Sequence, residues 1–185
     1  MRLAEFIREN MEDILAHWEA FAMTLLPAAS GMTSLALRDH APSILEAVAK
    51  DLDTPQTREQ QAEKSMGRAP RAEGAPETAA ETHAIMRARG GFDINQLVAE
   101  YRALRASVLR LWMDASPLDR SGVEDVIRFN EAIDQAVAES VGHFHATVER
   151  AREMAATVLA MPPATVRMVK EAVNATAGAL HAASS

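Results

Sequence analysis

The longest predicted helix constrains this chain more than any other feature of its sequence. From about residue 119 or 122 to Ala160 no proline interrupts the chain, and apolar residues recur in steps of three and four. A helix of nearly 40 residues spans roughly 55–60 Å at a rise of 1.5 Å per residue. That length exceeds the diameter of a domain of this size, so we expect its C-terminal half to protrude, bend or pair with another chain.

The repeating positions of this helix form a stripe that is typical of a coiled-coil seam. One polar residue, Asn130, interrupts the apolar stripe, and a polar residue at such a position fixes the register of a coiled coil. We therefore predict a homodimer formed along this helix. The candidate seam residues are Val123, Val126, Asn130, Ile133, Val137, Val141, Phe144 and Val148.

The rest of the chain is predicted to be helical as well. Alanine, the best helix former, accounts for 37 of the 185 residues, and runs of β-branched residues are scarce. The predicted helices cover residues 3–26, 34–40, 44–52, 56–65, 77–89 and 94–114, followed by the long helix and a last one over about 163–182. Ser43 and Glu46 are predicted to form a capping box. Residues 66–76 are predicted to form a flexible loop. This pattern predicts an all-α bundle of about six to eight helices.

Composition and charge exclude several classes of protein. The absence of cysteine excludes disulfides, thiolate metal sites and a cysteine nucleophile. The net charge of −7 argues against nucleic-acid binding, which needs a basic surface. The sequence has no run of 18 apolar residues, so no membrane span is predicted. The N-terminus lacks the apolar stretch of a signal peptide. We expect a cytoplasmic protein that binds neither nucleic acid nor membranes.

The sequence also lacks the motifs of the common catalytic and metal sites. No histidine follows a glutamate by three residues, as the di-iron helix bundles require. Neither the nucleophile motif Gly-x-Ser-x-Gly nor a glycine-rich phosphate loop occurs. We therefore expect a protein without enzymatic activity, metal or cofactor.

Two alternatives stay open from the residues themselves. His83 is a candidate phosphoacceptor, although the arginines and glycines after it stand at another spacing than in phosphotransfer modules. A small-ligand or haem site is the other alternative, with His40 or His83 as the haem ligand. Candidate pocket residues are Trp18, Phe21, His83, Tyr101 and Trp112. A candidate surface for an anion or a partner comprises Arg87, Arg89, Arg102, Arg105 and Arg110.

Three stretches carry a resemblance to a known family. They are LRDHAPSILEAVA (37–49), ETHAIMRARGGFDINQLVAEYRALRASVLRLW (81–112) and DVIRFNEAIDQAVAES (125–140). Together with 3–21 they resemble the RsbRD-type N-terminal domain, the helical input domain of stressosome co-antagonists and of many bacterial sensor histidine kinases. The resemblance implies a globin-like helical domain without haem, which dimerises and passes a signal to an output kinase or regulatory module, in cis or in trans.

The resemblance covers about residues 3–152, which predicts an input domain at 1–152 and a helical tail at 153–185. The histidine box and ATPase domain of the kinases do not follow it, so no kinase activity is expected of this chain. Within the tail, LAMPPATVRMVKEAVN (159–174) is weakly similar to the C-terminal segment of enoyl-CoA hydratases. The rest of that fold has no counterpart, so hydratase chemistry is not implied.

Overall fold

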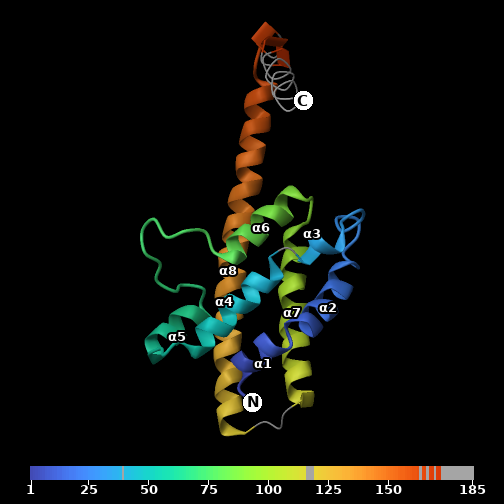
Figure 1. The fold of residues 1–185 in the computed structure, drawn as a ribbon. Coiled ribbons are helices and arrows are strands. Elements are labelled where there is room, and N and C mark those ends of the chain that lie inside the picture. Colours follow the sequence, from blue (N-terminus) through green and yellow to red (C-terminus); the bar gives the residue numbers. More distant parts are fainter. Residues whose placement is uncertain (39, 116–118, 163, 166, 169, 172–185) are drawn as a thin grey trace, which may run out of the picture. The chain divides into compact units, whose positions relative to one another are not determined.

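Helices make up the regular secondary structure of the part that the structure describes (Figure 1). The computed structural model describes residues 1–38, 40–115, 119–162, 164–165, 167–168 and 170–171, and no strand occurs among them. By compactness the chain divides into two units, Met1–Thr147 and Val148–Ser185. The predicted all-α bundle with a long helix near its C-terminus is confirmed.

The helices follow one another in the order α1 to α8 (Figure 1). Their bounds are Leu3–Glu9 (α1), Met11–Ala22 (α2), Ser34–Arg38 (α3), Ala41–Asp53 (α4), Arg58–Ser65 (α5), Ala79–Arg89 (α6), Ile94–Ala115 (α7) and Arg120–Leu159 (α8). None of these helices is long and apolar enough to cross a membrane. Most of the predicted helix at 163–182 lies outside the described residues.

Two predicted boundaries are wrong, for local reasons. The single helix predicted at 3–26 breaks at Asn10, which leaves the helical conformation and donates its side-chain amide to the Phe6 carbonyl. Helix α4 begins at Ala41 rather than after Ser43, so no capping box forms there. Pro42 occupies its first turn, where proline is tolerated because a backbone N–H at that position has no partner within the helix.

The core of the first unit lies between α1, α2, α4, α7 and the first part of α8. Helix α1 packs on α4, and α2 packs on α7. The largest fully buried apolar side chains are Trp18, Phe129, Leu3, Ile7, Ile14, Leu37, Leu45, Leu97, Leu104 and Ile133. A small apolar cluster of Ala22, Ala29, Leu37 and Phe92 supports the connection between α2 and α3.

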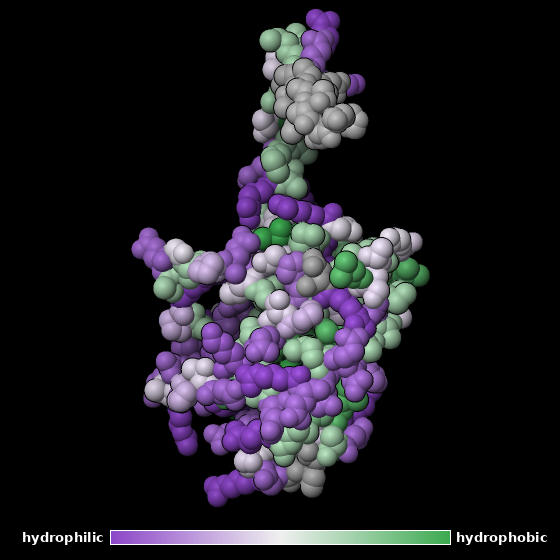
Figure 2. Space-filling model, in the orientation of Figure 1, coloured by the Kyte–Doolittle hydropathy of each residue, from purple (hydrophilic) through white to green (hydrophobic). Residues whose placement is uncertain are grey.

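The surface of this unit is mainly hydrophilic on the face drawn in Figure 2. Hydrophobic side chains gather on that face around the connection between α2 and α3. Met23, Leu26 and Leu35 are exposed there.

Helix α8 turns a different stripe to the core than the predicted seam. Its buried residues are Gly122, Asp125, Phe129, Ala132, Ile133, Ala136, Ser140 and Phe144. Only Ile133 and Phe144 belong to both stripes, whereas Val123 is exposed and the other seam residues are half-buried. Asn130 donates its side-chain amide to the Val126 carbonyl of its own helix at 2.8 Å. The two stripes therefore run side by side along α8.

A buried carboxylate fixes the N-terminal end of α1 to α8. Asp125 is 3% exposed and accepts hydrogen bonds from the Leu3 backbone N–H at 3.0 Å and from Arg2 Nε at 2.8 Å. Trp112 on α7 donates its indole N–H to the Met1 carbonyl at 3.2 Å. Backbone groups of the first three residues are thus hydrogen-bonded to side chains of both long helices, α7 and α8.

The difference between the buried and the exposed faces of α8 is directly testable with two isoleucines. Ile133→Ala, at a fully buried position, is expected to lower the free energy of unfolding by about 2–5 kcal/mol through lost burial and a new cavity. Ile127→Ala, where the side chain is 53% exposed, is expected to change it by about 0.5 kcal/mol or less. Urea denaturation measures both, and equal losses would contradict the assignment of the faces.

Candidate functional site

The interior contains a buried ionic cluster of His83, Arg87 and Glu100 between α6 and α7. The Glu100 carboxylate accepts hydrogen bonds from Arg87 Nε at 3.0 Å and lies 3.1 Å from His83 Nε2. Arg87 also donates from Nη2 to the Leu37 carbonyl at 2.8 Å, which ties in the end of α3. The three side chains are no more than 3% exposed, so the charges of Arg87 and Glu100 are compensated inside the protein rather than by water.

Aromatic rings enclose this cluster. The rings of Trp18 and Tyr101 lie 6.1 Å and 6.0 Å from that of His83, measured between centroids. Trp18 donates its indole N–H to the Glu100 carbonyl at 3.1 Å, and the Arg87 guanidinium lies 4.8 Å from the centre of the Phe92 ring. The remaining space beside the cluster is only about 10 Å³. This part of the interior is therefore filled, and it fixes α6 against α7.

The local sequence explains how these side chains meet. Thr78 and Glu81 form a capping box that starts α6, and His83 and Arg87 follow four residues apart on one face of that helix. Burial lowers the pKa of His83 below its ordinary value of 6.5, although the hydrogen bond and the charge of Glu100 act in the opposite direction. The imidazole is thus neutral at pH 7.

Three polar residues of α8, on adjacent turns, reach α6 beside this cluster. Ser140 Oγ donates to the Ala80 carbonyl at 2.8 Å and lies 2.7 Å from the Tyr101 hydroxyl. Burial raises the pKa of Tyr101, so that hydroxyl stays protonated. Glu139 accepts from Thr78 Oγ1 at 2.8 Å, and His143 Nδ1 lies 3.5 Å from Glu81 Oε1. A displacement of α8 would therefore have to rearrange hydrogen bonds at the start of α6.

The buried carboxylate of Glu81 also holds the loop before α6. Burial alone would raise the pKa of Glu81, but hydrogen bonds from Arg71 and from the Thr78 backbone, with the charge of His143, lower it. Arg71 pairs with Glu81 and donates to the Pro76 carbonyl at 2.6 Å. The loop that the sequence predicts to be flexible is thus tied to the capping box of α6.

The same loop is held against α8 further along. The Ala69 N–H donates to Gln135 Oε1 at 3.0 Å. Gly67 has a positive φ of 67°, and a Cβ atom built on it would overlap with the methyl group of Ala138. Glycine is therefore required there both by the backbone conformation and by the close approach to α8.

A cleft of about 230 Å³ lies between α4, this loop, the start of α6 and α8. Its apolar walls are Ile44, Ala47, Val48, Ala69, Ala79, Ala80, Ala132 and Ala136. Its polar groups are Asp51, Lys64, Thr78, Gln135 and Glu139. Small side chains leave the space open, while the paired polar groups supply donors and acceptors at its edge. An apolar pocket with few polar groups is the usual form of a small-molecule site.

The structure brings together some of the predicted pocket residues. Trp18, His83 and Tyr101 meet in the filled ionic cluster, whereas Phe21 lines a separate groove between α2 and α7. Trp112 lies at the other end of α7, bonded to Met1. None of these five lines the cleft.

The predicted arginine surface divides into two groups. Arg87 is buried against Glu100, and Arg105 pairs with Asp134 on α8. The other three, Arg89, Arg102 and Arg110, are exposed.

Sequence reasoning missed Glu100, Glu81 and Ser140. Glu100 continues the spacing of Leu97 and Leu104, so a charged residue at a core position was the available signal. Among the described residues, no three histidine, aspartate or glutamate side chains come together to hold a metal ion. The cleft between α4, α6 and α8 is the best candidate site because it combines apolar walls with polar groups at its edge.

Comparison with known proteins gives no match, since no family model, curated protein or solved structure is significantly similar to the chain. The RsbRD-type resemblance thus stays a prediction.

The burial of His83 predicts an acid-dependent loss of stability. Because its pKa is lower in the folded state, the unfolded chain binds the proton first, and stability falls as the pH drops below about 6.5. His83→Gln is expected to flatten the dependence of the melting temperature on pH between about 7.5 and 5. His145→Gln, at an exposed position, is the control. Parallel curves for the wild type and His83→Gln would rule out this role.

Proposed function

We propose that the chain is a non-catalytic sensory input domain of a bacterial signal-transduction protein. It acts as a homodimer through α8 and passes its signal to an output kinase or regulatory module, in cis or in trans. The observation that carries the proposal is that α8 both lines the cleft and continues far beyond it. Its residues Ala132, Gln135, Ala136 and Glu139 line the cleft, and the same unbroken helix runs on to Leu159.

The cleft is suited to a small organic signal molecule. Its volume of about 230 Å³ exceeds that of an engineered apolar cavity of about 150 Å³ that binds benzene. A ligand there would contact α4, α6 and α8 together, because all three helices contribute to the walls. Binding would thus change the packing of α8 against its neighbours.

Transmission follows from the continuity of α8. No proline interrupts it between Arg120 and Leu159, so a small shift at the cleft is carried along the helix rather than absorbed at a kink. Residues 151–159 are all exposed, and we propose that they contact a partner helix. The stripe of seam residues continues among them at Ala151, Ala155 and Val158.

The burial of His83 argues against its use as a phosphoacceptor or as a haem ligand. Its side chain is 3% exposed and faces Glu100, so a phosphoryl donor has no access to Nε2. The space of about 10 Å³ beside it is far too small for haem. A sensory role that needs no exposed histidine agrees better with this geometry.

Disulfide cross-linking along α8 tests the dimer. The chain has no cysteine, so each introduced thiol is the only one. Single cysteines at Ala151, Ala155 and Val158 are expected to give cross-linked dimers under mild oxidation, because seam residues of a parallel pair face one another. Cysteines at Glu153 and Ala156, on the opposite side of the helix, are the matched controls. A monomer by sedimentation at micromolar concentration, or cross-linking without periodicity, would overturn the dimer.

Filling the cleft tests the coupling. Ala136→Phe places a ring where a ligand would bind, at a position that is 9% exposed. Combined with Ala155→Cys, it is expected to change the rate of cross-linking, because the altered packing shifts α8. Ala16→Phe on the exposed face of α2 is the control. An unchanged rate in a folded Ala136→Phe variant would contradict signal transmission through α8.

A further inference from the structure

A second concave surface lies between α2 and α7, away from the cleft. It is a groove of about 540 Å³, and its lining runs along α7 from Ala99 to Arg110. These twelve residues of helix, separated by eleven steps of about 1.5 Å each, span roughly 16 Å. The groove is therefore elongated, and its length suits a segment of chain better than a compact small molecule.

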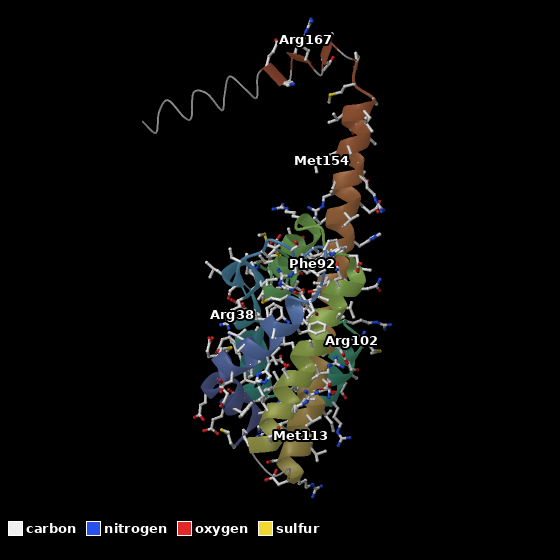
Figure 3. The ribbon with its side chains drawn as sticks, turned by 90° about the vertical axis from the view of Figure 1, so that its right-hand side faces the viewer. Arg38, Phe92, Arg102, Met113, Met154 and Arg167 are labelled. Carbon is white, nitrogen blue, oxygen red and sulfur yellow. The ribbon has the colours of Figure 1, made fainter. Side chains whose placement is uncertain are left out.

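Two arginines of this groove are available for an external partner. Arg102 and Arg110 are exposed, and among the described residues neither has an ion-pair or hydrogen-bond partner (Figure 3 labels Arg102 on α7). Arg87 and Arg105 of the same region are already paired with Glu100 and Asp134. The groove thus offers two uncompensated positive charges.

The remaining walls complete a surface for a helix. His17 and the half-buried ring of Phe21 form the α2 side, and small residues of α7 form the floor. No acidic side chain lines the groove among the described residues, although the whole chain carries a net charge of −7. Small side chains permit a close approach of another helix, and the arginines select its charge.

We infer that the groove between α2 and α7 is a docking site for an acidic amphipathic helix of a partner protein. Arg102 and Arg110 stand eight residues apart, or roughly 12 Å along the helix. A partner helix with carboxylates about two turns apart and an apolar side toward Phe21 matches this spacing. The charges set the orientation and the choice of partner, and the apolar contact adds affinity.

A charge exchange on the full-length chain tests this docking site. The probes are two fluorescent amphipathic peptides of leucine and alanine, one with glutamates two turns apart and one with lysines in their place. The wild type is expected to bind the glutamate peptide with micromolar affinity by anisotropy, and R102E/R110E to lose it by roughly tenfold or more. The same double variant is expected to gain binding of the lysine peptide.

The matched control is R68E/R89E, which changes the net charge equally through two exposed arginines outside the groove. It is expected to bind the glutamate peptide like the wild type. Failure of the wild type to bind this peptide, or equal losses in both double variants, would overturn the inference. Three further outcomes would also overturn it. Binding that inorganic phosphate abolishes at constant ionic strength would indicate a small-anion site, and a preference for anionic vesicles would indicate a membrane-binding surface. A dimer that R102E/R110E dissociates would indicate that a second copy of the chain occupies the groove.

Discussion

The buried Glu100 carboxylate is the constraint on which the packing of α3, α6 and α7 depends. An ion removed from water must be compensated where it lies. Arg87 supplies the opposite charge, and neutral His83 adds a hydrogen-bonding group at 3.1 Å. Because Arg87 also binds the Leu37 carbonyl, this single carboxylate fixes α3, α6 and α7 at once. Because α6 also forms one wall of the adjoining cleft, the same interactions position that wall.

Helix α8 carries two neighbouring stripes of residues, one that packs in the core and one that we propose for the dimer. One stripe, with Phe129 and Ile133, completes the core of the first unit. The other, with Val137 and Val141, is half-buried. The polar residues Glu139, Ser140 and His143 connect the helix to the start of α6. A structural change at the cleft would therefore act on α8 through these hydrogen bonds.

The sequence predicts the fold better than the site, and the physical reason is the range of the interactions. Helical periodicity is local, so it predicts the helical class, the long α8 and the buried stripe of α7 with Leu97 and Leu104. It does not distinguish two apolar stripes on one helix, which explains why the seam differs from the core face. The pairing of Glu100 with Arg87 depends on contacts between distant helices that no local pattern contains. The same holds for the cleft beside the loop that connects α5 to α6.

The hydrogen bonds of Arg87 and His83 have a consequence for local motion. If α6 unfolded alone, the carboxylate of Glu100 would be left in an apolar environment of Trp18 and Leu104 without its cation. Such a partly open state would carry the cost of an uncompensated buried charge, so it would be scarcely populated. The amide protons of α6 should thus exchange with solvent together with those of α7, as one cooperative unit. The apolar residues that α6 buries are the alanines Ala80 and Ala84, so we expect the ion pair of Arg87 with Glu100, rather than hydrophobic area, to limit fraying of this helix.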